Sequence, residues 1–457
     1  MSKLAEISLI LGLAIAVLAF GGVETISFSV VEVIFFGAAA LLLATSPEIM
    51  PPSFGKAALI PALLGGIVLL QLCPLPSSLL HRVTGRDIAQ PGIRAGYLSF
   101  EPYATRTHFL ILLTGFVAFY FAQLVSQDRA RKQFVIRALV ALGAFEAFYG
   151  LVQYLTGWQQ IFVYVKKFDL EEATGTYINR NHYAGFLEMI LPFSLAFLFY
   201  EYGKLQGDRE SGRELRNMVG KSAIQRLILS LAVSVILCAA LIFSRSRMGI
   251  LAAAASILVI FALVSISRFR GRMGSLLAAT FILLSICLAV WIGPGSIVSR
   301  FQTVNEEYSL GGQSRVSMWR DAFPLIEHHP LLGTGLGTFP IAYTSGQTAF
   351  LSQYVNHAHN DYLEIAADLG IPSALILFVS ILFILGRAIR SFLSGERDFE
   401  RAVALGCVGS IVAILLHGFA DFNLYIPANV LLFSTILGLA VSVRMPSPGA
   451  RGEPIAA

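Results

Sequence analysis

Charged residues are scarce in this sequence. Of its 457 residues, 13% are Asp, Glu, Lys or Arg, whereas 56% are hydrophobic, and the mean hydropathy is +0.72. A water-soluble chain of this length could not bury so much apolar surface. Cysteine is rare as well: Cys73, Cys238, Cys287 and Cys407 all lie in apolar runs without CxxC spacing. They therefore indicate neither a zinc site nor a disulfide framework.

Long apolar runs are what the sequence has in abundance. Many reach roughly 17 to 20 residues with few charges, which is the length of a helix that crosses a bilayer. We therefore expect an all-α polytopic membrane protein with about 12 transmembrane helices. The expected spans are residues 7–20, 27–45, 57–74, 107–125, 134–155, 184–202, 227–243, 249–267, 275–292, 371–389, 402–420 and 428–444.

The distribution of Lys and Arg predicts the orientation of these spans. With the N-terminus inside, the inner segments hold 20 of the 33 basic residues and the outer segments hold 12, while Arg137 lies within a span. This bias predicts that both termini are cytoplasmic, and it argues against a nucleic-acid partner for the net charge of +5. The expected parts are nine spans in residues 1–292, a large outer loop at 293–370, three spans in 371–444 and a cytoplasmic tail at 445–457.

Polar residues concentrate in five short segments, all on the expected outer side. They are "GTYINRNHYAGF" (175–186), "SRSRMG" (244–249), "GGQSRVSMWR" (311–320), "HAHNDYLE" (357–364) and "HGFADFNLYIP" (417–427). Apolar spacing at Met318, Ala322, Phe323, Leu325 and Ile326 also predicts a short amphipathic helix near the membrane surface. The large outer loop is therefore expected to be partly helical.

Four of the arginines in these segments are candidates for binding an anion, namely Arg180, Arg245, Arg247 and Arg315. Each could be an ordinary solvated charge or could reach outward to lipid headgroups. Outer arginines oppose the positive-inside bias, however, and their convergence favours an anion site. A guanidinium group binds phosphate oxygens with two parallel hydrogen bonds and keeps its charge at any working pH.

His357 and His359 allow three interpretations. They could be hydrogen-bonded structural residues, or metal ligands completed by a residue such as His182, Asp361 or Asp421, although nothing in the spacing completes such a site. One of them could instead be a general base, because an imidazole held by a carboxylate can remove a proton from a hydroxyl group. If "DYLEIAADLG" is helical, both histidines lie at its start, near the carboxylates of Asp361 and Glu364.

Anion-binding arginines and a histidine base, both facing outward from a bilayer, favour one type of reaction. A phosphorylated lipid would be the donor and a hydroxyl group the acceptor. Metal-assisted transfer would predict an outer D-x-D motif, and the nearest approach is Asp169-x-Glu171. We therefore expect arginine to neutralise the phosphate charge, and we expect no metal and no cofactor.

The order of these segments resembles the O-antigen ligase / Wzy polymerase superfamily of bacterial membrane glycosyltransferases. The resemblance covers roughly residues 170–430. It rests on "NRNHYAGF", "SRSRMG", "SRVSMWRDAFPLIEHHPLLGTGLGTF", "HAHNDYLEIAADLGIPSALIL" and "DFNLYIPAN". The H-P-x-x-G-x-G run and the H-N-x-Y-L-E element together are fairly specific to the superfamily, and a large outer loop after the ninth span is similar to the ligase architecture.

The resemblance implies a helical fold of the GT-C type and an inverting, metal-independent reaction. It implies a glycan donor on undecaprenyl diphosphate and a site that faces the periplasm from the inner membrane. The family's essential histidine precedes an asparagine, which matches His359 and Asn360, with His357 as a neighbour. Its outer arginines match Arg315 and either Arg245 or Arg247 best, while Arg180 matches less closely and His182 lies beside it in "NRNH".

Three functions remain open from the sequence. A ligase would transfer the glycan to a sugar of lipid A–core, whereas a Wzy-type polymerase would transfer it to another lipid-linked repeat unit. We favour the ligase on the similarity in topology. A lipid-linked glycan transporter would also fit twelve spans, but its polar residues should line a path at the membrane midplane. Here the charges cluster at one face, and Arg137 and Glu188 are exceptions within the spans.

Overall fold

The computed structural model describes residues 2–45, 59–84, 95–207, 213–266, 315–348, 354–394 and 398–443. The expected span 275–292, the first part of the large loop and the tail 445–457 lie outside these residues. The elements are α1 (Ser2–Leu18), η1 (Phe20–Gly22), α2 (Thr25–Thr45), α4 (Leu59–Gln71), β1 (Pro74–Pro76), α5 (Ser77–Thr84), β2 (Ala95–Tyr97), α6 (Pro102–Val125), α7 (Arg129–Thr156), β3 (Gln160–Ile161), β4 (Tyr164–Val165), α8 (Arg180–Gly207), α9 (Arg213–Phe243), α10 (Arg247–Ile266), α14 (Arg315–His328), α15 (Phe339–Tyr343), α16 (Asp361–Leu369), α17 (Ile371–Ser394), α18 (Asp398–His417), η4 (Asn423–Tyr425) and α19 (Pro427–Ser442).

The described part of the chain is a bundle of long helices, as expected from the apolar runs. Eight of its helices are long and apolar enough to cross a membrane. The expected spans at the positions of α1, α4 and α19 also form helices, but these have 17, 13 and 16 residues and are shorter than a usual membrane helix. The polytopic membrane class is thus confirmed, whereas the count of twelve and the GT-C-like arrangement stay predictions.

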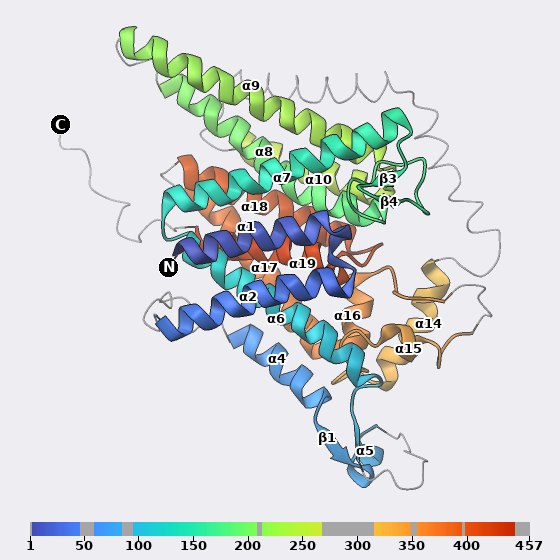
Figure 1. Cartoon of the computed structure of the whole chain (residues 1–457). Coiled ribbons are helices and arrows are strands. Elements are labelled where there is room, and N and C mark those ends of the chain that lie inside the picture. Colours follow the sequence, from blue (N-terminus) through green and yellow to red (C-terminus); the bar gives the residue numbers. More distant parts are fainter. Residues whose placement is uncertain are drawn as a thin grey trace.

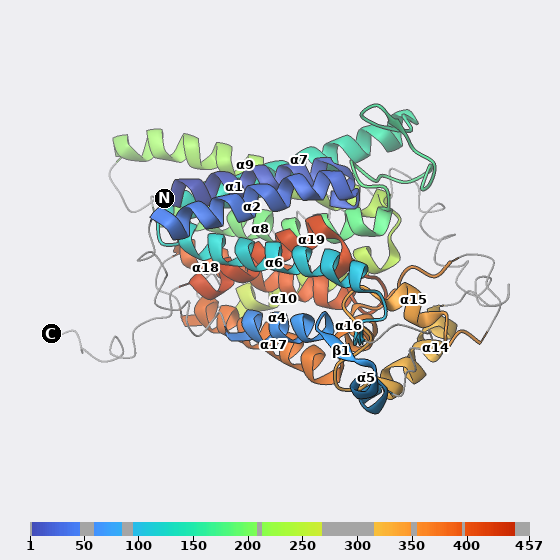
Figure 2. The same cartoon turned by 60° about the horizontal axis from the view of Figure 1, so that its bottom comes forward.

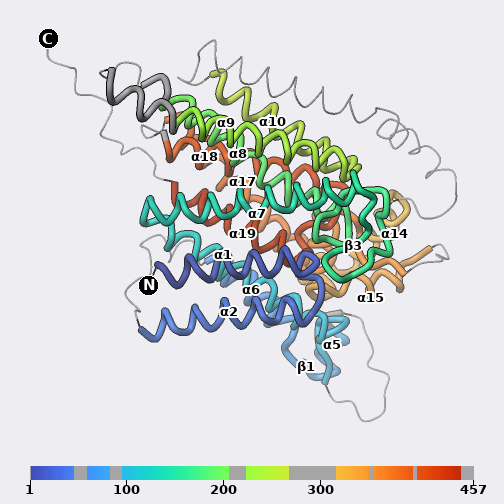
Figure 3. Tube along the Cα trace, turned by 45° about the horizontal axis from the view of Figure 1, so that its top comes forward, coloured from blue at the N-terminus to red at the C-terminus, as the bar shows by residue number. Residues whose placement is uncertain are grey.

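Helix α8 lies at the centre of the bundle and packs against α18, α9 and α10. Of the membrane-length segment of α8, 94% is buried, against 22% for α17, so α8 is shielded from lipid by its neighbours. Figures 1 and 2 show α1, α2, α6 and α19 packed on one side of this centre. The N-terminus lies at the opposite end of the bundle from α14 and α15 (Figures 1 and 3).

Helices α14, α15 and α16, which lie between α10 and α17 in the sequence, form a small layer at one end of the bundle (Figure 1). Helices α14, α15 and α16 share an apolar core that is separate from the main one and includes Leu325, Phe339, Tyr343, Ala358 and Ala367. The expected amphipathic helix is thus present as α14, and Ala322, Leu325 and Ile326 are buried in this core. Phe323 is different, because its side chain is exposed.

The glycine-rich run between α14 and α15 ties this layer to α16. The N–H of Gly335 donates to the carbonyl of Asp368, and the N–H of Gly337 donates to the Asp368 carboxylate at 2.6 Å. Gly337 has a φ of +76°, and a Cβ at this position would lie 2.1 Å from Nδ1 of His108. Only glycine fits this close approach. In the structure the run holds the end of α16 in place.

Two short two-stranded antiparallel sheets complete the same end of the molecule. Strand β1 pairs with β2, and Pro74 lies opposite Tyr97, whereas β3 pairs with β4, and Gln160 lies opposite Val165. The second sheet follows α7 after Gly157, which ends the helix in the left-handed conformation with a φ of +69°. The chain then returns to α8 through the first polar segment of the sequence.

Candidate active site

The structure brings the described parts of the five polar segments together at this end of the bundle. The segment with the two histidines enters α16, and Asn360 is the N-cap of that helix. Its Oδ1 accepts the N–H groups of Tyr362 and Leu363, and its Nδ2 donates to the Phe419 carbonyl. Asn360 therefore uses its amide to fix the start of α16 and the segment that carries the histidines.

His359 precedes this cap and has a φ of +50°. A non-glycine residue is strained in this region, and such strain is often found where a side chain must be aimed at a functional site. The His359 side chain is 31% exposed, and its Nδ1 lies 3.5 Å from Oδ1 of Asp421, whose side chain is 1% exposed. The sequence offered Asp361 or Glu364 as the carboxylate beside this histidine, and the structure places Asp421 there instead.

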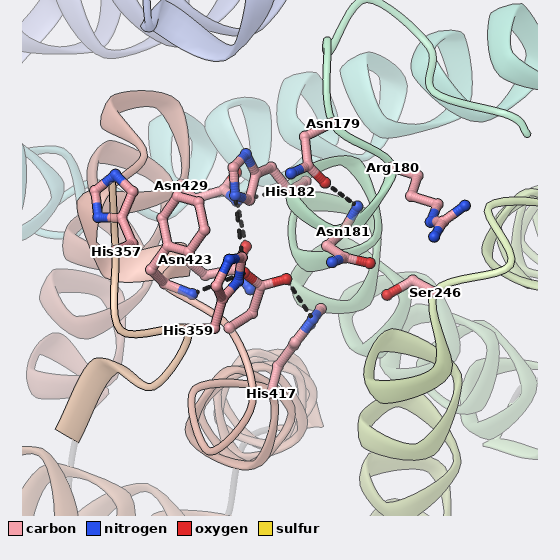
Figure 4. Close-up of polar contacts among 12 residues, drawn as sticks. Asn179, Arg180, Asn181, His182, Ser246, His357, His359, His417, Asn423 and Asn429 are labelled. Atoms are coloured by element: carbon pink, nitrogen blue, oxygen red, sulfur yellow. Dashed lines mark hydrogen bonds and ion pairs between the residues drawn. The ribbon is translucent and has the colours of Figure 1, made fainter. Parts of the chain in front are cut away.

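Asp421 faces three imidazoles. Besides His359, Nε2 of His182 lies 3.9 Å from Oδ1 of Asp421, and Nε2 of His417 lies 3.8 Å from Oδ2. Figure 4 shows the three rings converging from three separate parts of the chain. Burial by itself would raise the pKa of Asp421, but the nearby imidazoles of His359, His182 and His417 hold that pKa below its usual range. Asp421 is therefore an anion at any working pH.

A second carboxylate supports this arrangement from within the bundle. Both oxygens of Glu188 lie 3.0 Å from Nδ1 of His417, and both side chains are fully buried. His417 thus lies between Glu188 on α8 and Asp421 beyond the end of α18. A buried carboxylate needs such a partner, because an unpaired charge in the core is costly.

A hydrogen-bond network of asparagine side chains fixes the position of His182. Nδ2 of Asn429 donates to the His182 carbonyl at 3.0 Å and to Oδ1 of Asn423 at 2.9 Å. The Tyr177 hydroxyl donates to Oδ1 of Asn429 at 3.1 Å. This network joins the start of α8 to α19, so the position of His182 depends on how these helices pack.

His357 forms a separate pair with Glu364. Its Nδ1 lies 2.6 Å from Oε1 of Glu364, while Oε2 of the same carboxylate accepts the Ala358 N–H at 2.8 Å. The His357 ring stacks on Phe422, with 3.8 Å between centroids and 11° between planes. His182 and His359 each contact Phe422 through the ring edge. Phe422 therefore spaces the three histidines apart.

These histidines line a common cavity of about 470 Å³. Its wall includes His182, His357, His359 and His108, together with apolar residues such as Met318 and Ile426. The volume is in the range of pockets that bind small ligands or single sugar units. The cavity therefore offers imidazole nitrogens to a bound molecule while Asp421 and Glu188 lie behind them.

Arg180 and the segment that carries Arg245 and Arg247 lie on the other side of His182 from His357 (Figure 4). Figure 4 shows this for Arg180 and for Ser246, which is flanked in sequence by Arg245 and Arg247. Arg180 pairs with Glu172 at 2.5 Å and with Asp169 at 3.4 Å. Arg245, which has a φ of +51°, pairs with Glu171 at 3.1 Å. The charges of these two guanidinium groups are thus matched by carboxylates of the preceding loop.

Arg247 and Arg315 each begin a helix at this end. Arg247 is the first residue of α10, and Arg315 is the first residue of α14. Arg315 is close enough to His417 for their charges to interact. All eight site residues expected from the sequence therefore lie at the same end of the molecule, with the histidines around the cavity and the arginines beside it.

The sequence assigned no role in organising the site to four residues, namely Asp421, Phe422, His417 and Glu188, although Asp421 was considered as a possible metal ligand. Three of them belong to "HGFADFNLYIP", which was recognisable as a polar cluster, and Glu188 was recognisable as a carboxylate inside a span. Among the residues that the structure describes, no group of three His, Cys, Asp or Glu side chains could hold a metal ion. His357 and His359 instead each face a different carboxylate.

Comparison with known families adds a finding of a different kind. Residues 232–379 match the family described as O-Antigen ligase. The matched region includes Arg245, Arg247, Arg315, His357 and His359, and it ends before Asp421. No curated protein matches the chain.

Proposed function

We propose that this chain, whose residues 232–379 match the O-Antigen ligase family, is a membrane glycosyltransferase that transfers a glycan from undecaprenyl diphosphate to a sugar hydroxyl. The observation that carries the proposal is the cavity in which His359, backed by the buried Asp421, faces the same space as His357 and His182. The multi-pass helical bundle fits an enzyme whose substrates are lipids in a membrane. The site would face the periplasm from the inner membrane.

His359 is the general base in this proposal. With Nδ1 toward Asp421, its Nε2 accepts the proton of the acceptor hydroxyl as that oxygen attacks the anomeric carbon. The new bond joins the acceptor oxygen to the anomeric carbon, and the bond from that carbon to the diphosphate oxygen breaks. Undecaprenyl diphosphate leaves with the electron pair. A single displacement of this kind inverts the anomeric configuration.

The arginines neutralise the departing diphosphate. Arg315 and the pair Arg245 and Arg247 begin or precede helices, so backbone N–H groups accompany their side chains at the site. Arg180 and Arg245 are paired with Glu172 and Glu171, and a diphosphate would compete with these carboxylates for the guanidinium groups. Arginine then supplies the charge stabilisation for which other glycosyltransferases use a metal ion, and neither metal nor cofactor takes part.

His357 shapes the acceptor side of the cavity. Glu364 holds its Nδ1 at 2.6 Å, and Phe422 fixes the plane of its ring, so its Nε2 has one preferred direction. From there it can hydrogen-bond a sugar hydroxyl. This arrangement suits an orienting residue, while the partly exposed His359 is the better base.

Reconstitution with a purified undecaprenyl-diphosphate glycan tests the proposal. The acceptors are lipid A–core in one set of vesicles and a second lipid-linked repeat unit in another. We favour the ligase and therefore expect product on lipid A–core. Product only on the lipid-linked repeat would identify a polymerase instead. Absence of product with both acceptors, in protein that is folded and inserted, would contradict glycosyl transfer and favour a transporter.

A further inference from the structure

A long apolar groove runs down the outside of the bundle from the site. Its volume is about 670 Å³, and its walls are formed by α4, α6, α17 and α19. Along α17 the wall extends from Leu377 to Arg387, which is about 15 Å of helix at about 1.5 Å per residue. Along α19 it extends from Val430 to Val441, which is about 17 Å. This length suits an extended hydrocarbon chain, since one leaflet contributes about 15 Å of hydrocarbon.

The groove is open to the surroundings of the bundle. Val379 and Phe383 in its wall are 60% and 72% exposed, and α17 is the least buried of the membrane-length helices in the described chain. A groove with this lining, on a helix that faces lipid, matches a lipid chain better than a polar ligand.

One end of the groove meets the candidate active site at His108. The side chain of His108 lines both the groove and the polar cavity, whose wall also includes His357 and Glu364. Tyr425, another groove residue at this end, contacts His357 through its ring and donates a hydrogen bond to Asp368. A lipid chain in the groove would therefore deliver its head to the His357 side of the cavity.

Arg180 and Ser246, which is flanked in sequence by Arg245 and Arg247, lie on the other side of the histidines from His357 (Figure 4). In Figure 4 the order is His357, then His359, then Arg180 and Ser246. A diphosphate bound to the arginines would approach His359 from that side, whereas a molecule held in the groove would approach from the side of His357. The base thus lies between the two approaches, as a transfer between two lipid-linked substrates requires.

We propose that this groove binds the hydrocarbon chain of the acceptor lipid and presents its sugar to His359. The inference rests on the proposed function, and it assigns the two sides of the cavity to different substrates. The donor's polyprenyl chain stays outside the groove. For a ligase, the occupant is an acyl chain of lipid A–core.

Photocrosslinking from the groove tests the occupant directly. Phe383→benzoylphenylalanine places the reactive group in the groove, and Leu382→benzoylphenylalanine is the matched control, because Leu382 is 55% exposed on the same helix outside the groove wall. We expect labelled lipid A–core to crosslink from position 383 well above the control, and labelled undecaprenyl-diphosphate glycan to remain at control level. Crosslinking of the donor instead, or of bilayer phospholipid alone, would overturn the assignment.

Kinetics with a deacylated acceptor separate this proposal from the proposed function. Val379→Trp narrows the groove at an exposed position, and Leu375→Trp is its control outside the wall. We expect Val379→Trp to raise KM for lipid A–core by about tenfold or more, as the loss of part of a chain's contact would do, and to leave KM for the deacylated core unchanged. Equal KM changes for both acceptors would refute the groove assignment. Absence of turnover with either acceptor in the unmodified protein would refute the glycosyltransferase function instead.

Discussion

Asp421→Asn is the substitution that most directly tests how the site works. The change keeps the size of the side chain, and the amide oxygen can still accept the Phe422 N–H that Oδ1 accepts at 2.9 Å. What it removes is the negative charge that three imidazoles face. The variant should therefore fold, while His359 loses the group that orients it and stabilises its protonated form.

The size of the effect follows from the geometry. A carboxylate and an imidazolium 3.5 Å apart interact with about 5 kcal/mol at an effective dielectric constant of about 20. His359 is 31% exposed, so water screens part of this interaction. A loss of about 2–4 kcal/mol of transition-state stabilisation remains, which is a fall in kcat/KM of about 30-fold to 1,000-fold.

The assay is glycan transfer by purified protein in vesicles, with kcat/KM measured against pH. Activity should fall on the acid side, because a protonated imidazole accepts no proton. The double variant Asp421→Asn/His359→Ala should be no worse than His359→Ala alone, because Asp421 acts through His359. Turnover within about threefold of wild type in a folded Asp421→Asn protein would refute the reasoning.

Three further predictions concern other residues of the same layer. His359→Ala should lower turnover by about 10²–10⁴-fold with donor binding kept. The control is His328→Ala, at an exposed position. Full activity in His359→Ala with activity lost in His357→Ala would reverse the two roles. Arg315→Lys keeps the charge but loses the guanidinium fork, so kcat should fall on the order of a hundredfold or more. Arg320→Lys, at an exposed position of α14, should leave kcat unchanged. Wild-type turnover in Arg315→Lys would make Arg315 a surface charge. Burial and the charge of Glu364 raise the pKa of Asp368, so the folded protein binds a proton that the unfolded chain releases above about pH 4. The stability of wild type should therefore fall as pH rises through that window up to the raised pKa, and Asp368→Asn should lessen the fall in thermal scans between pH 5 and 9; an unchanged pH dependence would contradict this.

Local sequence predicted the helices and part of the site well. Apolar runs of membrane length correspond to helices throughout the described chain, because hydrophobicity alone selects a helix in a membrane. The H-N-D-Y-L-E element predicted a helix with histidines at its start, and Asn360 is its N-cap. An asparagine directly before a helical pattern is a typical start signal, so the capping role of Asn360 was also within reach of the sequence.

The partners of the histidines could not be predicted in this way. His417 and Glu188 are 229 residues apart, and only the packing of α18 on α8 brings them together. His359 and Asp421 meet because the N–H of Asp361 donates to the carbonyls of Gly418 and Asp421, which ties the start of α16 to the turn after α18. Such contacts are set by tertiary structure. Glu364, which the sequence placed near both histidines, is instead committed to His357.

The electrostatics of the site and the packing of the bundle therefore depend on the same helices. α8 provides His182 and Glu188, and α18 ends at His417, so the three groups that support Asp421 lie on two of the most buried helices of the described chain. Gly185 shows how tight this contact is, since a Cβ there would lie 2.2 Å from Oδ1 of Asn423. A displaced Asn423 would disturb the network that fixes His182. Changes far from the cavity along α8 and α18 should thus affect catalysis by moving the imidazoles around Asp421.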